Sequence, residues 1–155
     1  MFASMTVQDV LRRKGRGYWA VNPSTTAYDA LELMAEKNIG ALLVMEDKRL
    51  VGMFSERDYA RKVILKGKSS RTTSVEELMS SPPICAGPAM SLHECMVLMT
   101  GNHIRHVPVL QDGAVFGVLS INDVVNATIS CQEELIQQME NYIAGDDCAR
   151  PALPA

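Results

Sequence analysis

The segment Gly52-Met-Phe-Ser-Glu-Arg-Asp58 recurs 65 positions later as Gly117-Val-Leu-Ser-Ile-Asn-Asp123. Around these two segments, residues 23–58 align with residues 88–123 without a gap, and identical residues recur along the whole alignment. Self-similarity at a fixed spacing is the mark of a duplicated structural unit. The chain is therefore predicted to contain two copies of one fold.

The first helix of each copy is predicted from its N-cap. Thr26 and Ser91 are good N-cap residues, and Asp29 and Glu94 follow three positions later, as a capping box requires. Apolar residues then recur at helical spacing in both copies. Each helix is expected to bury one face.

A hairpin is predicted after that helix in each copy. Short apolar runs are joined by polar turns, and the Asp112-Gly113 turn is a strong hairpin signal. Pro108 lies inside one run, which indicates an edge position or a bulge. A second helix is expected after Ser55 and again after Ser120. The predicted strands cover residues 41–45 and 50–54 in the first copy, and 107–110 and 115–119 in the second.

Each copy is thus a β-α-β-β-α unit of the α+β class, because short extended segments at 18–21 and 84–86 precede the first helices. A unit of this size buries little surface alone. Two copies related by a pseudo-twofold axis are therefore expected to pack face to face. Ser130 is predicted to cap a C-terminal helix that ends at Gly145. We divide the chain into repeat 1 (1–68), repeat 2 (69–129) and a C-terminal helix and tail (130–155), with a linker at 66–73.

The composition is that of a soluble globular protein. Of the 155 residues, 47% are hydrophobic, and the net charge of −3 argues against general nucleic-acid binding. No apolar run reaches the roughly 18 residues of a membrane span, and the N-terminus lacks the pattern of a signal peptide. A cytoplasmic protein is expected. The spacing of the four cysteines and three histidines fits no metal or redox motif.

The duplicated pattern resembles the CBS domain, named for cystathionine β-synthase, which usually occurs as a tandem pair called a Bateman module. The resemblance covers residues 7–129 and rests on the tandem register, on Ile39-Gly-Ala-Leu-Leu-Val with Ile104-Arg-His-Val-Pro-Val, and on the two quoted segments. It implies clefts between the repeats that bind adenosyl ligands: AMP first, with ADP, ATP, NAD(H) or S-adenosylmethionine as alternatives. It also implies a disk-like homodimer that passes its signal to an unidentified partner protein.

The resemblance also assigns residues to two clefts. Asp58 and Asp123 would accept hydrogen bonds from ribose hydroxyls, while Ser55 and Ser120 would face the phosphate. Carboxylate oxygens suit a vicinal diol, and free N–H groups at a helix start suit an anion. Apolar residues would enclose the adenine: Val21, Ile39, Ala41 and Leu43 in the first cleft, and Ile84, Ala86 and Pro108 in the second.

Positive charge would come from different residues in the two clefts. Arg57 and Arg61 lie one helical turn apart and could place guanidinium groups beside a phosphate in the first cleft. Asn122 replaces Arg57 in the second copy, so Arg105 and His106 would supply the charge there. The two clefts are therefore expected to differ.

Several alternatives remain open from the sequence. Ser55 with Asp58, and Ser120 with Asp123, are also plain capping boxes. The basic run 12–16 fits a solvated helix end, a phosphate contact or a nucleic-acid patch. The apolar stripe after Ser130 could pack on the protein's own core or on a partner subunit. No catalytic residue is assigned, although an enzyme and an interaction module with vestigial clefts stay as alternatives.

Overall fold

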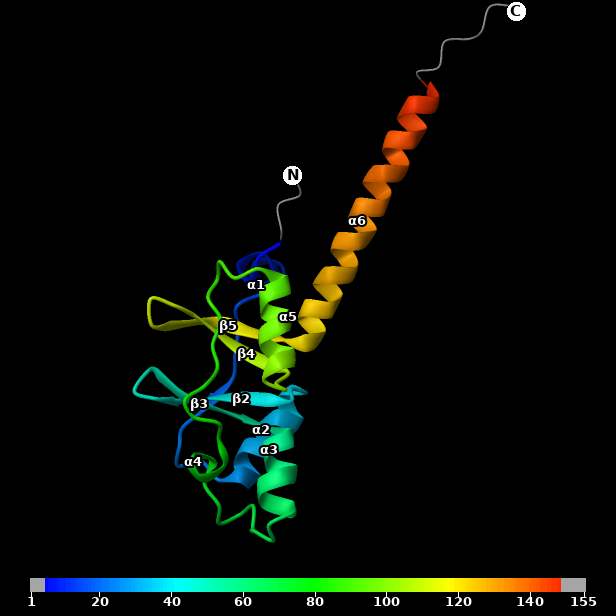
Figure 1. Cartoon of the computed structure of the whole chain (residues 1–155). Helices are drawn as coiled ribbons and strands as arrows, with labels where there is room; N and C mark the ends of the chain where they lie inside the picture. The colour runs from blue at the N-terminus through cyan, green and yellow to red at the C-terminus, as the bar shows by residue number, and fades with distance from the viewer. Residues whose placement is uncertain (1–4, 149–155) are drawn as a thin grey trace, which may run out of the picture.

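The computed structural model describes residues 5–148 and contains two repeats stacked one above the other, with a long helix projecting from one end (Figure 1). The first repeat has a sheet of three strands in the order β1-β2-β3, formed by Ala20–Val21, Ala41–Glu46 and Arg49–Ser55. Strand β1 runs parallel to β2, and β2 pairs antiparallel with β3. The predicted leading segment therefore joins the sheet.

The second repeat has the same arrangement with a shorter edge. Strands β4 (His106–Gln111) and β5 (Ala114–Ser120) form the antiparallel hairpin. The predicted leading segment contributes only a parallel bridge between Ala86 and Val109. The amide of Ala86 donates to the carbonyl of Pro108 at 2.9 Å. Pro108 therefore faces the weakly paired side of β4, where its lack of a backbone N–H is tolerated.

Both hairpins turn through residues with positive φ, as their polar turn sequences predict. Asp47 and Lys48 have φ of 50° and 64°, and Asp112 and Gly113 have φ of 52° and 79°. These values fit two-residue turns whose twist matches that of the strands. The two hairpins are therefore held in equivalent registers.

The helices follow from their caps. Helix α2 (Ala27–Lys37) begins after Thr26, and α5 (Leu92–Gly101) begins after Ser91 with a complete capping box. Helix α3 (Glu56–Tyr59) continues directly into a π-helical segment, η1 (Ala60–Ile64). No helix in residues 5–148 is long and apolar enough to cross a bilayer.

The two hydrophobic cores exchange their leading helices. Val7 and Leu11 of α1 (Val7–Lys14) are fully buried in the core of the second repeat, whereas Val75 and Leu78 of α4 (Val75–Leu78) are buried in the core of the first. The packing units therefore cross the boundary drawn at residue 68 of the sequence. The predicted linker, residues 66–73, contacts α2, since the amide of Tyr28 donates to the carbonyl of Ser70.

Helix α6 runs without a break from Ile121 to Cys148. The predictions that a separate helix starts at Ser130 and stops at Gly145 were wrong. Val124 is buried and Ala127 packs against the core, so helical spacing already holds before Ser130. A single glycine costs a helix only about 1 kcal/mol, and Gly145 does not end it. Residues 149–155 of the predicted tail lie outside the described residues.

Candidate functional site: a cavity between the two repeats

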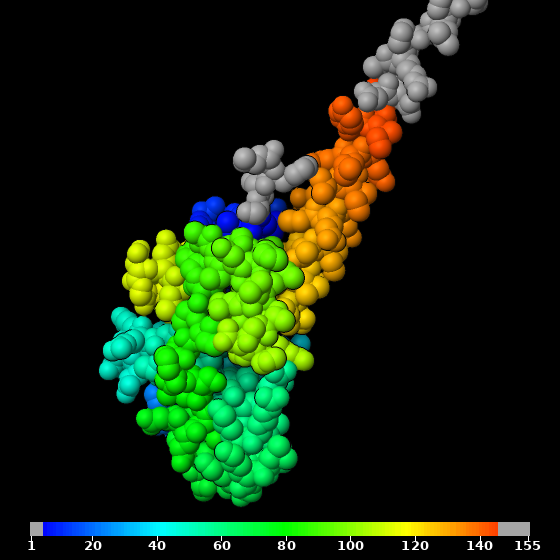
Figure 2. Space-filling model, viewed as in Figure 1, coloured from blue at the N-terminus to red at the C-terminus, as the bar shows by residue number. Residues whose placement is uncertain are grey.

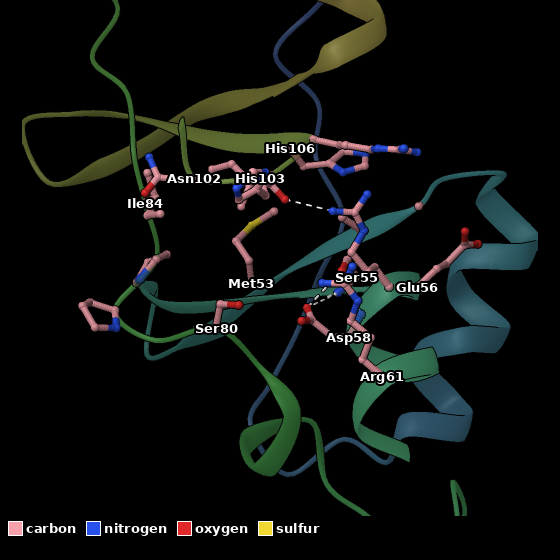
Figure 3. A pocket seen from close by; sticks show the side chains of 17 residues that line it. Met53, Ser55, Glu56, Asp58, Arg61, Ser80, Ile84, Asn102, His103 and His106 are labelled. Carbon is pink, nitrogen blue, oxygen red and sulfur yellow. Dashed lines mark hydrogen bonds between the residues drawn. The ribbon is translucent and has the colours of Figure 1, made fainter. Parts of the chain in front are cut away.

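A cavity of about 560 Å³ lies between the repeats, within the range typical of sites for small molecules (Figure 3). The first repeat contributes the ends of β2 and β3 and the start of α3. The second contributes the loop between α5 and β4, and the segment after α4 crosses one side. The lining residues are Gly40, Ala41, Met53, Ser55, Glu56, Arg57, Asp58, Arg61, Ser80, Pro82, Pro83, Ile84, Asn102, His103, Ile104, Arg105 and His106.

Ser55 and Asp58 form a complete capping box at the wall of this cavity. Asp58 Oδ2 accepts hydrogen bonds from the Ser55 amide and from Ser55 Oγ, both at 3.0 Å. The Asp58 amide donates to Ser55 Oγ at 3.2 Å. The other carboxylate oxygen of Asp58, Oδ1, lies 3.5 Å from Lys62 Nζ. Lys62 Nζ also donates to the backbone carbonyl of Leu78. The capping role is thus real, and Asp58 still has acceptor capacity on the cavity side.

Arginines from both repeats meet in the cavity. Arg57 Nη1 donates to the carbonyl of His103 at 2.9 Å, which links α3 of the first repeat to the second repeat. Arg61 and Arg105 line the same space, with Glu56 and Asp58 as the carboxylates among the lining residues. The arrangement favours an anionic ligand.

Arg105 and His106, which were assigned to the second cleft from the sequence, both line the first cavity. The loop before β4 faces the start of α3, and a methyl group on Gly40 would lie 3.5 Å from the His106 ring. Burial lowers the pKa of His106, as do the nearby Lys14 and Arg105, while Asp123 opposes them. His106 is therefore biased toward its uncharged form and lies between the first cavity and the Lys14–Asp123 pair.

Eight of the predicted residues share this cavity: Ala41, Ser55, Arg57, Asp58, Arg61, Ile84, Arg105 and His106. Seven others do not line it: Val21, Ile39, Leu43, Ala86, Pro108, Ser120 and Asp123. Ile84 was assigned to the second cleft and lies in the first. Val21 and Ile39 pack against the first core, and Ala86 is buried in the second. These three apolar residues therefore belong to the hydrophobic cores and not to the wall of the cavity.

The sequence prediction missed other lining residues. Met53 was not among the predicted site residues, but it precedes Ser55 by two positions on β3 and so shares its face. The alternation of side chains along a strand is therefore the sequence signal that could have identified Met53 as a lining residue. Ser80 pairs with Met53 through two backbone hydrogen bonds of 2.9 and 3.1 Å, and nothing in its local sequence indicates this contact.

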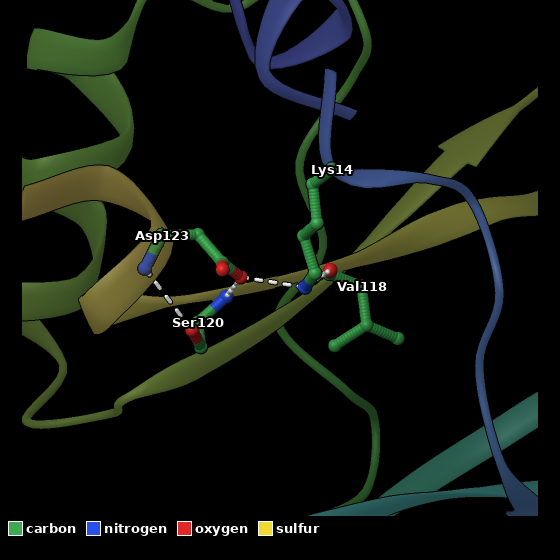
Figure 4. Close-up of polar contacts among 4 residues, drawn as sticks. All are labelled: Lys14, Val118, Ser120 and Asp123. Atoms are coloured by element: carbon green, nitrogen blue, oxygen red, sulfur yellow. Dashed lines mark hydrogen bonds and ion pairs between the residues drawn. The ribbon is translucent and has the colours of Figure 1, made fainter. Parts of the chain in front are cut away.

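Where the sequence predicts the second cleft, Asp123 is paired with a side chain of the protein itself, Lys14 (Figure 4). Asp123 Oδ2 accepts from the Ser120 amide at 2.8 Å and from Lys14 Nζ at 2.5 Å, and Lys14 also donates to the Val118 carbonyl. Partial burial opposes ionisation of Asp123, but the hydrogen bonds from Lys14 and Ser120 outweigh it and lower its pKa. None of the three interpretations of the basic run predicted this ion pair.

The fold and the site define a tandem pair of CBS domains. The CBS domain family model matches residues 7–64 and 75–130, so this chain belongs to the CBS-domain family. The chain is 39% identical over 153 residues to the CBS domain-containing protein CBSX3, mitochondrial, of Arabidopsis thaliana, covering 93% of this chain and 74% of the relative.

Solved structures agree with this fold. A protein with CBS domains from Burkholderia ambifaria superposes with a TM-score of 0.79 at 44% identity, covering 81% of this chain and 95% of that one. The CBS domain pair of protein MJ0100, solved with 5′-methylthioadenosine and S-adenosyl-L-methionine, has a TM-score of 0.73 at 21% identity and covers 83% and 98%. At that identity the likeness shows the fold alone.

Proposed function

We propose that this chain is a regulatory module that binds an adenine nucleotide in the cavity between its repeats and catalyses no reaction. The observation that carries the proposal is the meeting of Ser55, Asp58 and three arginines in one cavity. A carboxylate accepts from ribose hydroxyls, and guanidinium groups pair with phosphate oxygens. The module would report the adenylate charge of the cell to a separate partner protein.

AMP is the first choice of ligand, with ADP, ATP and NAD(H) as alternatives. Arg57, Arg61 and Arg105 outnumber the carboxylates Glu56 and Asp58 in the cavity, so a ligand with a phosphate gains more than a neutral nucleoside. Protein MJ0100 was solved with adenosyl compounds, which is compatible with an adenine ligand in this fold. The cationic wall here favours anionic members of that class.

Thermal unfolding with each nucleotide tests the proposal. A ligand that binds only the folded chain at a hundredfold excess over its Kd adds about 2.7 kcal/mol. The Tm should then rise by at least several degrees with AMP, and by less with GMP or CMP. No shift with any adenine nucleotide would favour an interaction module with vestigial clefts. Consumption of the bound nucleotide would favour an enzyme.

A homodimer is the second part of the proposal. The far half of α6 projects from the body of the molecule, as the space-filling view also shows (Figures 1 and 2). Its large apolar side chains are exposed: Ile136 is 56% exposed, Met139 58%, Tyr142 74% and Ile143 63%. Isolated helices are marginal in water without tertiary packing. Pairing of two α6 helices, with the stripe between them, would cover these residues.

The compartment is proposed to be the cytoplasm. The name of the Arabidopsis relative places that protein in mitochondria. Imaging of a C-terminal fluorescent fusion, with a mitochondrial marker for comparison, distinguishes the two compartments.

A further inference from the structure

Lys14 bridges the counterparts of two residues that line the nucleotide cavity. Val118 and Asp123 occupy the positions in repeat 2 that Met53 and Asp58 occupy in repeat 1. The ammonium group of Lys14 donates to the carbonyl of Val118 at 2.8 Å and to the carboxylate of Asp123 (Figure 4). In the second repeat, Lys14 therefore contacts the counterparts of two residues that line the first cavity.

The first repeat has no equivalent of this contact. Helix α4 corresponds to α1 at an offset of 68 residues, so Pro82 is the residue equivalent to Lys14 in this alignment. Proline carries no charge, and Pro82 lines the first cavity. Lys62 does lie near Asp58, but it comes from the same helical segment and is not among the cavity-lining residues. Asp58 therefore lines an open cavity, whereas Asp123 is paired with Lys14 from another helix.

Lys14 is held in place by its neighbours in sequence. A methyl group on Gly117 would lie 3.2 Å from both methyl carbons of Leu11, so the end of α1 packs directly on β5. Arg16 donates from Nε to the carbonyl of Phe116 at 2.9 Å and stacks its guanidinium 3.7 Å from the Phe116 ring. Gly15 has φ of 107° and makes the turn between these two anchors. The segment is thus fixed on both sides of Lys14.

We propose that Lys14 is the resident occupant of the second cleft and closes it to nucleotides, so that one nucleotide binds per chain. This inference rests on the proposed function for the first cavity. A nucleotide entering the second cleft has to replace a hydrogen bond between two charged groups, which lowers its affinity there by about tenfold or more. Because the equivalent position beside the first cavity is Pro82, this lysine determines the binding capacity of the pair.

Isothermal titration calorimetry with AMP tests this inference on the full chain. Lys14→Met removes the ammonium group and keeps an apolar stem. Arg13→Met is the matched control, because it removes the same charge one position away, where Arg13 pairs with Glu134 at 3.8 Å. We expect one AMP per chain for the wild type and for Arg13→Met, and two for Lys14→Met. Adding Asp123→Asn to Lys14→Met should return the stoichiometry to one.

Each result decides between the proposals. Two AMP molecules on the wild type, or a single one on Lys14→Met with unchanged circular dichroism, would overturn the role of Lys14 alone. A second AMP that survives Asp123→Asn would overturn it too. A wild type that binds none, beside a Lys14→Met variant that binds one through Asp123, would overturn the proposed first site and support the role of Lys14. No binding by either protein would overturn both.

Discussion

Arg57, at the start of α3 in the first repeat, donates a 2.9 Å hydrogen bond to the backbone carbonyl of His103 in the second repeat. The same side chain lines the cavity between the repeats. A guanidinium has five N–H donors, so Arg57 can keep His103 and still contact a phosphate. A ligand anion at Arg57 would therefore be connected directly to the contact between the repeats.

Arg57→Ala should weaken AMP binding by about tenfold or more, because a hydrogen bond to a charged group is worth about 1.5–3 kcal/mol. Adenosine carries no phosphate, so its affinity should change only slightly. Titrations of both ligands against the wild type and the variant measure the difference. Equal losses for AMP and adenosine would mean that Arg57 acts only as a link between the repeats. Arg49→Ala, on the exposed start of β3, is the control.

Asp58→Asn and Asp123→Asn form a matched pair of substitutions, one in each repeat. Asp58→Asn should lower AMP affinity about ten- to a hundredfold, since a charged acceptor for the ribose is lost. Asp123→Asn should leave it unchanged, because Lys14 already occupies that carboxylate. Calorimetry with AMP and 2′-deoxy-AMP gives the second readout: the preference for AMP should shrink only in Asp58→Asn. Similar losses in both variants would show that both clefts bind AMP.

The sequence repeat predicted much of the fold because each element carries its own local signal. The caps at Thr26 and Ser91 start their helices, and the turns at residues 47–48 and 112–113 fix their hairpins. What the repeat could not predict is which copy supplies the opposite wall of a cleft. Arg105 reaches the first cavity only through the packing of one repeat on the other, and no local pattern encodes that contact.

Lys14 shows a second limit of sequence reasoning. It is the last residue of α1, whose core residue Leu11 packs in the second repeat although it belongs to the first in sequence. The basic run therefore lies beside Asp123, 109 positions away. From the sequence alone, a run at the end of a helix is typical of a solvated terminus. Because the leading helices are exchanged, Lys14 of that run contacts Asp123 of the second repeat.

The exchange of leading helices predicts a large loss of stability from one substitution in α1. Leu11 is fully buried, so Leu11→Ala should lower the free energy of unfolding by about 2–5 kcal/mol, as for other large-to-small core changes. Leu65 is 78% exposed, and Leu65→Ala should change it by no more than about 0.5 kcal/mol. Urea titrations followed by circular dichroism measure both. Near-equal values would contradict the packing of α1 in the second core.

His106 predicts a pH dependence of stability. Its pKa in the folded chain is below the ordinary value of 6.5, first because of burial and then because of Lys14. The unfolded chain therefore takes up the proton more readily, and the folded state loses stability as the pH falls through about 6.5. His106→Asn should reduce the loss between about pH 7.5 and pH 5.5. His93→Asn, at an exposed position on α5, should not.

Asp123 acts in a different range, because its lowered pKa makes the folded state lose stability only as the pH falls below the ordinary value of 3.8. Melting curves at closely spaced pH values thus distinguish the two groups. A wild type whose Tm is flat between pH 7.5 and pH 5.5 would contradict the effect of burial on His106.

The last prediction concerns the projecting half of α6. Ile136 is the first large apolar residue of the exposed stripe, with Met139 one turn further along. If two chains pair through this stripe, Ile136→Glu places a carboxylate in an apolar seam, where an unpaired charge is strongly unfavourable. Light scattering after size exclusion should give the mass of two chains for the wild type and of one for Ile136→Glu. Gln137→Glu adds the same charge at the next position, outside the stripe, and should leave the dimer intact. A wild type that stays a single chain at tens of micromolar would refute the dimer, whereas an Ile136→Glu dimer would place the interface elsewhere on the molecule.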